Sequence, residues 1–525
     1  MKIKLTPTEK QRAYRERQKS NAFDEKTVTE SVTEKLENVT EFDTTETTPE
    51  NPSISWQTTL KNHIDDFNSK YAVVFYGGKT SVLKEFRHPE TKKILREFMR
   101  FQDFQNLFCH KQIKVGEKQN EARTPIKKTY GEAWLENHNR RQCTDGIVFE
   151  PSTYVNGIER PTQIYGDKLN FWQGYSVEPK KGGTWTLLDK HIKDVICQCN
   201  TECVEYLYNW IARCLQYPNL NGQVALVLKG EKGAGKGVLG NFLVSLFDTH
   251  GLQINNSKHL TSNFNAHMAD CCLLFADEVF FAGDKSHENI LKGLVTEPTL
   301  FIERKGIDGE TTPNRLKIIM SSNNDWVIPA SSDERRYFVL EVSSQYLKQK
   351  SYFDPLRAEL ENPKTKAAFL WDMLHRDISN FDVHNVPETD ALKHQRAQSL
   401  DSFGKFWLDV LERGYIYQSQ HNTLELNQWT PEPATDLIRA GYKQWCDDYK
   451  IGQFGILTSE QIGKHLAKWG YEKKQKRTPL VIGESHTGEL LKSSARARYY
   501  RVGSLDDAIK SFCEAEKIEF SEILG

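Results

Sequence analysis

A glycine-rich segment that contains lysines is the feature of this 525-residue chain best suited to chemistry. It reads GEKGAGKGV and stands between the apolar run VALVL and an amphipathic stretch. Glycines let the backbone bend so that successive N–H groups face one anion, and a following helix adds partial positive charge. The segment therefore predicts a phosphate-binding loop in which Lys236 reaches the β- and γ-phosphates of a nucleotide. The expected nucleotide-binding residues are Gly230, Glu231, Lys232, Gly233, Ala234, Gly235, Lys236, Gly237 and Val238.

The position after the loop lysine departs from the usual pattern. A Ser or Thr hydroxyl normally stands there and ligates Mg²⁺, whereas this chain has Gly237 followed by Val238. The metal must then depend on the phosphates, water and a downstream carboxylate. Weaker retention of Mg²⁺, and even loss of hydrolysis, stay open as alternatives.

Two adjacent acids follow the apolar run CCLLFA. At the end of a buried strand beside a phosphate loop, Asp277 is expected to hold Mg²⁺ and Glu278 to polarise the attacking water, with both carboxylates assigned to the metal site. A pair of solvated strand-end acids is the simpler alternative. The phosphate loop upstream favours the catalytic interpretation.

Two further polar groups follow the acids along the chain. Asn323 ends the run LKIIMSS and is expected to orient the attacking water; its neighbour Asn324 is the weaker candidate. Arg335 and Arg336 precede the run YFVLEV and could form a salt-bridged surface pair or supply an arginine finger to the transferred phosphoryl group. We favour the finger, and Arg336 in particular, because it directly adjoins the strand.

The segment 298–317 predicts a β-hairpin with a turn containing Gly306 and Gly309. Arg304 and Lys305 then lie near its tip. A protruding basic hairpin suits the phosphates of a single DNA strand. An exposed hairpin with solvated charges remains the alternative.

These residues need a scaffold that places the ends of several strands together. Short continuous apolar runs alternate with helical segments, which predicts a parallel sheet covered on both faces and hence an α/β fold. A helix is also expected over residues 203–215, because its apolar residues recur at helical spacing. The four expected strands are residues 224–228, 271–276, 316–322 and 337–342.

Composition narrows the class of protein. Hydrophobic residues make up 38% and charged residues 27%, so folded cores are expected. No apolar run approaches the ~18–20 residues of a membrane span, and the charged start lacks the apolar region of a secretory signal. The ten irregularly spaced cysteines do not suggest a disulfide framework. We expect a soluble protein of a reducing compartment, without a membrane partner.

Local charge and composition divide the chain. The net charge is −1 overall, but residues 1–20 are basic and residues 21–55 acidic and Thr-rich, so residues 1–55 are expected to be a disordered tail. Residues 56–220 are expected to form an α+β accessory or collar domain, 221–345 the ATPase core, and 346–430 a helical region. Residues 431–525 combine a helix-turn-helix-like pattern with basic residues, which is consistent with a winged-helix domain for duplex DNA or, equally, with a solvated face.

The order of these motifs resembles the superfamily 3 helicases, a branch of the AAA+ ATPases found in viruses, phages and satellites. Phosphate loop, acidic pair, basic hairpin, Asn strand and arginine all lie between Gly230 and Arg336. Four segments are most similar to the primase-helicases of phages and mobile elements that are related to the poxvirus type. They are LVLKGEKGAGKGVLG, LLFADE, FIERKG and SSNNDWVIPASSDERRYFVLEVS. In that branch Gly after the loop lysine is a familiar variant.

The resemblance implies a ring, expected to be a homohexamer, with ATP and Mg²⁺ between subunits and the arginine finger acting on the neighbour's nucleotide. The hairpins would line the pore and draw single-stranded DNA through it in the 3′-to-5′ direction, in the cytoplasm of a bacterial host. Many relatives carry a primase, but residues 56–220 show no convincing primase acids, so a separate primase partner is expected.

Two rival functions remain. The chain could be an ATP-dependent origin-recognition switch that assembles without unwinding, in which case Arg304 and Lys305 would be dispensable. It could also be a small-molecule kinase, which is disfavoured because the arginine pair and the Asn strand need a neighbouring subunit.

Overall fold

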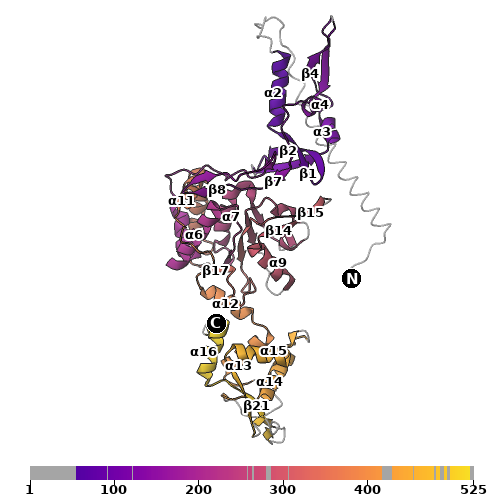
Figure 1. Cartoon of the computed structure of the whole chain (residues 1–525). Helices are drawn as coiled ribbons and strands as arrows, with labels where there is room; N and C mark the ends of the chain where they lie inside the picture. The colour runs from indigo at the N-terminus through magenta and orange to yellow at the C-terminus, as the bar shows by residue number, and fades with distance from the viewer. Residues whose placement is uncertain are drawn as a thin grey trace, which may run out of the picture. The chain divides into compact units, whose positions relative to one another are not determined.

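The computed structural model describes most of the chain between residues 55 and 520 (Figure 1). The expected tail, residues 1–55, lies outside the described residues except for Ser55. The chain divides into two units, residues 1–62 with 114–126 and residues 63–113 with 127–525. None of the described helices is long and apolar enough to cross a membrane. The described residues are 55–90, 93–120, 122–256, 258–262, 265–278, 285–304, 307–416, 429–452, 455–477, 481–484, 490–492 and 497–520.

The first unit holds the beginning of helix α2 (Trp56–Asn68), most of strand β4 (Gln112–Glu117) and the first two residues of its partner strand β5 (Pro125–Thr129). Lys114 lies over the ring of Trp56, with its Nζ 5.4 Å from the ring centre.

The second unit begins with a small sheet of order β3-β2-β1-β6. Strands β1 to β3 pair antiparallel, and β6 joins β1 in parallel. Its packing is mainly aromatic: Phe104 and Trp134 are fully buried, with ring centres 5.2 Å apart. The elements of this part are β1 (Tyr71–Tyr76), β2 (Lys79–Arg87), β3 (Ile94–Met99), α3 (Phe101–Leu107), α4 (Tyr130–Leu135), β6 (Gln142–Cys143), β7 (Ile147–Val148), β8 (Thr153–Val155), β9 (Ile158–Arg160) and β10 (Leu169–Asn170).

Three helical segments connect this sheet to the centre of the second unit: α5 (Thr186–Lys190), η1 (His191–Ile196) and α6 (Thr201–Gln216). Helix α6 confirms the helix expected over residues 203–215. The Asn200 side chain caps it by accepting a 3.0 Å hydrogen bond from the backbone N–H of Cys203.

The central sheet has five strands, all parallel, in the order β12-β13-β16-β11-β17. The four predicted strands are present within two residues of their expected bounds, and the α/β class is confirmed. The fifth strand, β12, was not predicted, because GLQI is too short and too polar to stand out as an apolar run. The strands are β11 (Ala225–Lys229), β12 (Gly251–Ile254), β13 (Leu273–Asp277), β16 (Lys317–Ser322) and β17 (Tyr337–Glu341).

Two hydrophobic clusters cover the two faces of this sheet. Alternate residues of each strand belong to one cluster or the other, because successive side chains of a strand point to opposite faces. Helices α6, α7 (Lys236–Phe247), α10 (Lys350–Glu361) and α11 (Pro363–His375) pack on one face. Helix α9 (Lys285–Thr296) and strand β14 (Thr299–Arg304) pack on the other, as Figure 1 shows.

The predicted hairpin is confirmed as β14 (Thr299–Arg304) paired antiparallel with β15 (Ile307–Pro313). Gly309, expected in the turn, instead lies within β15. A Cβ there would come 2.4 Å from the Phe301 ring, so the missing side chain leaves room for that ring to lie across the strand pair.

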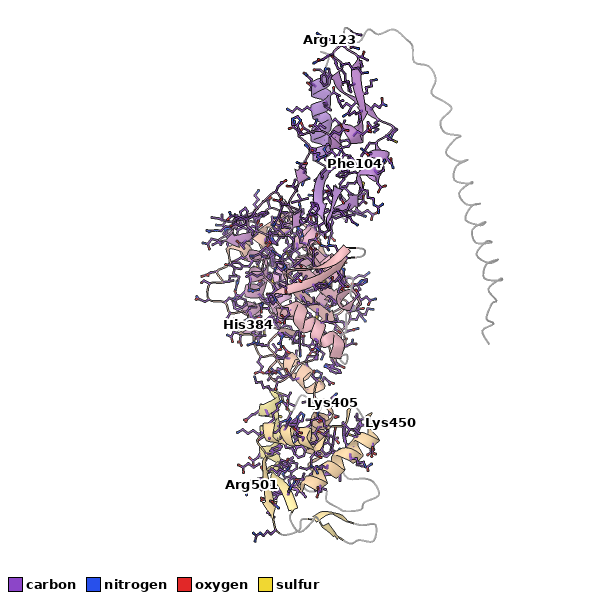
Figure 2. The ribbon with its side chains drawn as sticks, turned by 45° about the vertical axis from the view of Figure 1, so that its right-hand side comes forward. Phe104, Arg123, His384, Lys405, Lys450 and Arg501 are labelled. Carbon is purple, nitrogen blue, oxygen red and sulfur yellow. The ribbon has the colours of Figure 1, made fainter. Side chains whose placement is uncertain are left out.

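The C-terminal part has a hydrophobic cluster of its own, centred on the buried side chains of Phe403, Trp407 and Trp469. Lys405, Lys450 and Arg501 mark this part in Figure 2. It contains helices and two antiparallel strand pairs, and the winged-helix domain stays a prediction. Helix α12 (Asp390–Gln398) precedes this part and packs on the central sheet through Ala391 and Leu392. The elements of the C-terminal part are α13 (Ser402–Arg413), α14 (Thr435–Asp448), α15 (Ser459–Lys468), β18 (Glu472–Lys476), β19 (Val481–Glu484), β20 (Leu490–Lys492), β21 (Ala497–Arg501) and α16 (Leu505–Glu516).

Candidate functional site

The glycine-rich segment forms a loop between β11 and α7, as its sequence predicts. Gly233 and Gly235 have φ of 94° and 100°, a region that side chains disfavour. At Gly235 a Cβ would also come 2.6 Å from the His191 ring. The loop therefore needs glycine at this position for both its backbone conformation and its packing.

Lys236 begins α7 at the end of the loop and is largely buried. Its Nζ donates hydrogen bonds to the backbone carbonyls of Gly230 and, at 2.8 Å, Glu231. Burial lowers the pKa of Lys236, and the nearby carboxylates of Asp277 and Glu278 act against that shift. The ammonium group is thus held at the loop, where it can meet a phosphate.

His191 supports the loop from the side, a role that sequence analysis did not assign. Its Nε2 lies 3.2 Å from the Gly235 carbonyl oxygen and its Nδ1 3.1 Å from the Tyr352 hydroxyl. Burial lowers the pKa of His191 to about 4, so the ring is neutral near pH 7. A carbonyl only accepts hydrogen bonds, so Nε2–H donates to Gly235 and Nδ1 accepts from Tyr352.

The two predicted acids lie at the carboxyl edge of the sheet. Asp277 ends β13, where its Oδ1 accepts a hydrogen bond from the Ser321 hydroxyl and its Oδ2 one of 3.3 Å from the Gln253 amide. Glu278 is exposed and has a φ of 56°, which is unfavourable for a residue with a side chain. Its backbone N–H donates to the Ser321 carbonyl at 2.9 Å. This backbone conformation and hydrogen bond orient the bond from Cα to Cβ of Glu278 at the end of the strand.

Gly237 faces the first of these acids. A Cβ built there would lie 4.0 Å from Asp277 Oδ2 and 3.6 Å from the Asn241 amide nitrogen, with no closer neighbour. The position that normally carries the metal-binding hydroxyl is therefore directed at Asp277, with room for a side chain. One carboxylate beside a phosphate loop fits Mg²⁺, which usually binds one or two carboxylates together with phosphate oxygens and water.

A cavity of about 520 Å³ lies over the loop and the acids. Its volume is in the range of small-molecule sites. One wall comes from α10 and α11, which sequence analysis had described only as helical. Apart from the loop, α7 and the two acids, the lining residues are Phe353, Arg357, Leu360, Glu361 and Lys366.

Asn323 follows β16, the strand between β11 and β13. The register aligns Ser321 with Asp277 and Ser322 with Lys229, so Asn323 lies at the same edge of the sheet as the loop and the acids. Its side chain is exposed and does not contribute to the described lining of the cavity. The backbone N–H of Asn324 bonds to the Ser322 hydroxyl at 3.1 Å and begins the turn.

Arg335 and Arg336 lie at the opposite edge of the sheet. They precede β17, whose first residue pairs with Ala225 at the start of β11, whereas the loop follows the end of β11. The buried carboxylate of Glu334 accepts from the backbone N–H groups of both arginines, at 3.1 and 2.9 Å, and pairs with the Arg336 guanidinium at 3.3 Å. Among the described residues that line the cavity, neither arginine is present.

Arg304 is held at the end of β14. It forms an ion pair of 3.2 Å with Glu310 and a hydrogen bond with the Tyr76 hydroxyl. The other expected DNA contact, Lys305, lies outside the described residues.

Comparison with known proteins gives two sequence matches. Residues 228–336 match a family model described only as a family of unknown function, DUF5906. The DNA primase-polymerase of Nitratiruptor phage NrS-1 is 30% identical over 301 residues, which cover 55% of this chain and 40% of that protein. The chain is homologous to part of this phage protein. It spans about two fifths of the relative's length.

Solved structures show weaker likenesses. The C-terminal region (305–718) of NrS-1 in its apo form has a TM-score of 0.48 at 17% identity, over 80% of this chain and 96% of that one. A structure of JCV helicase bound to a synthetic acetamide has a TM-score of 0.25 at 15% identity, over 40% of this chain and 59% of that one.

Proposed function

We propose that the protein is an ATP-dependent DNA helicase serving replication of a phage or mobile element, active as a hexameric ring on single-stranded DNA. The motif order that resembles superfamily 3 helicases supports this proposal, as does the homology to a phage DNA primase-polymerase. Movement in the 3′-to-5′ direction is expected from the resemblance alone.

In this proposal the loop, the two acids and Asn323 at the carboxyl edge of the sheet divide the work of hydrolysis. The loop N–H groups and Lys236 bind the phosphates, and the exposed carboxylate of Glu278 polarises the attacking water, with Asn323 orienting it. Asp277 would hold Mg²⁺, which supplies positive charge to the phosphates when bound. The α10 and α11 wall leaves space for the rest of the nucleotide beside α7.

The observation that carries the proposal is the position of Arg336. Arg336 lies beside the start of β11, and the loop follows the end of that strand. The four residue steps of β11 rise ~3.3 Å each, so the two lie roughly 13 Å apart along the strand. An arginine at the far edge of the sheet does not serve the loop of its own chain. It suits the nucleotide of a second copy, where the fork of an arginine matches phosphoryl oxygens.

The DNA would be held by the hairpin β14–β15, with Arg304 and Lys305 near its tip. The basic face of the C-terminal part, including Lys473 and Arg498, is a second expected DNA contact and suits a duplex. A separate primase is the expected partner in replication.

The test is ATP hydrolysis with and without single-stranded DNA, for the wild type, Lys236→Ala, Arg336→Ala and an equimolar mixture of the two variants. DNA-stimulated turnover should be lost in each variant and partly regained on mixing, because mixed interfaces combine an intact loop with an intact arginine. Arg336→Ala with full activity and no response to DNA would remove the helicase proposal.

A nucleotide-driven switch that binds DNA without unwinding is the second candidate. The pairing of Arg304 with Glu310 and Tyr76 favours it, since a paired guanidinium is less available to phosphates. Strand displacement from a forked duplex separates the two: unwinding that requires Arg304 and Lys305 supports the helicase, and nucleotide-dependent binding without displacement supports the switch.

A further inference from the structure

A second cavity, also of about 520 Å³, lies beside the hairpin β14–β15. One wall is the hairpin itself, with Arg304 of β14 and residues 310–313 of β15. Strands β1, β3 and β7, the segments that follow β7 and β10, residues of the segment 266–270 and Arg315 form the other walls. The aromatic and basic side chains that define it are Tyr76, Phe98, Phe149, Arg96, Arg304 and Arg315.

Two of the aromatic side chains form a stacked pair, of which Phe98 is the member open to solvent. Tyr76 and Phe98 stack with ring centres 5.1 Å apart and planes inclined by 16°. Phe98 is 43% exposed although it lies in a strand, so part of its surface remains uncovered. Exposed aromatic planes of this kind are where proteins stack the bases of a single strand.

The charged groups of the cavity balance one another. Three arginines are each paired with a carboxylate of the lining: Arg96 with Asp270 at 2.9 Å, Arg304 with Glu310 at 3.2 Å and Arg315 with Glu150 at 2.5 Å. The cavity thus offers hydrogen-bond donors and acceptors without a net charge. This combination suits the polar edge of a neutral planar ring better than it suits a phosphate.

Arg315 is the least exposed of these three arginines, and Glu150 and the Pro313 carbonyl hold its guanidinium. It is 7% exposed, and its Nε finds no hydrogen-bond partner among the residues that the structure describes. A buried donor without an acceptor is costly. Because this Nε is covered by protein atoms, Arg315 lines the cavity through its other atoms.

We propose that this cavity holds one unpaired base of a single DNA strand, stacked on the exposed ring of Phe98. The inference rests on the DNA substrate of the proposed function but not on ATP hydrolysis. Because Arg304 reaches both the hairpin and Tyr76, a base in the cavity would be continuous with a strand on the hairpin.

The test is binding of the full chain to a labelled single-stranded oligothymidylate, followed by fluorescence anisotropy without nucleotide. Phe98→Ala should weaken binding about tenfold, since stacking on one aromatic side chain contributes ~1.4 kcal/mol or more per base. Phe98→Leu should weaken it similarly while keeping an apolar side chain. Phe75→Ala is the matched control, because Phe75 is a 48% exposed aromatic of β1 outside the cavity lining.

An abasic strand of the same length distinguishes a base from the backbone. Wild type and Phe98→Ala should bind it equally; an equal loss on both strands would overturn the inference. Free thymidine should not displace the strand at concentrations well above the strand's Kd, and displacement would assign the cavity to a free nucleoside instead. A wild type that binds no strand refutes the proposed function, whereas strong binding that ignores Phe98 refutes only this inference.

Discussion

At the scale of single residues, the substitution Gly237→Ser tests the metal site. The new side chain has room and faces Asp277, so its hydroxyl can join the carboxylate as a Mg²⁺ ligand. We expect the Mg²⁺ concentration that gives half-maximal ATP hydrolysis to fall several-fold. Gly293→Ser, in α9 with similar room, is the control and should leave that concentration unchanged. Equal midpoints for both variants would contradict the assigned role of position 237.

A second residue-scale prediction concerns His191. Replacing it with Ala removes both hydrogen bonds that link Gly235 to Tyr352, and each is worth roughly 1 kcal/mol. We expect nucleotide affinity, measured with a fluorescent ATP analogue, to fall about tenfold because the loop loses its lateral support.

Tyr352→Phe is the graded companion of that variant, because it removes one of the two bonds and keeps the ring. It should weaken nucleotide binding by roughly fivefold. An unchanged affinity in both variants would show that the loop holds its conformation without His191.

At the scale of elements, the C-terminal helices have a core separate from those of the central sheet. Trp407 of α13 is fully buried in that core. Trp407→Ala should cost about 3–5 kcal/mol there. Calorimetry with bound nucleotide should show that the C-terminal part unfolds at a lower temperature, while the unfolding temperature of the central sheet is unchanged. A single transition shifted as a whole would mean that the two cores unfold together.

At the scale of the whole molecule, buried histidines make stability depend on pH. Burial lowers the pKa of His191 and of His250 to about 4, from an ordinary value of 6.5. Between those values the unfolded chain binds more protons, so stability falls as pH drops from about 6.5 towards 4 and is unaffected above that range. Below pH 4, each histidine has lowered the free energy of unfolding by ~3 kcal/mol relative to its value near pH 7.

Denaturant unfolding at several pH values measures this dependence. His250→Gln should flatten the fall between about pH 4 and 6.5, because one source of the proton difference is gone. His384→Gln is the control, since His384 is exposed (Figure 2). The explanation is wrong if both variants keep the wild-type slope.

Prediction from sequence succeeded where the signal is local. The loop between β11 and α7, the strand ends at Asp277 and Asn323 and the helix α6 depend on short apolar runs, glycines and spacing. It failed for β12, whose four residues carry no distinct pattern, and for the place of Gly309, which depends on the Phe301 ring across the hairpin. His191 could have been noticed only as a lone histidine before α6, which is too weak a signal to assign a role.

The sequence by itself therefore determined the α/β class and the chemical groups of the candidate site. Both depend on local patterns, because short apolar runs and glycines among consecutive residues indicate buried strands and tight turns. The tertiary structure alone decided which distant segments meet: His191 and α10 against the loop, and the β1, β3 and hairpin walls of the second cavity. It also decided that Arg336 lies at the far edge of the sheet from Lys236. These placements follow from strand order and register, which arise when separate elements pack together to bury their apolar faces.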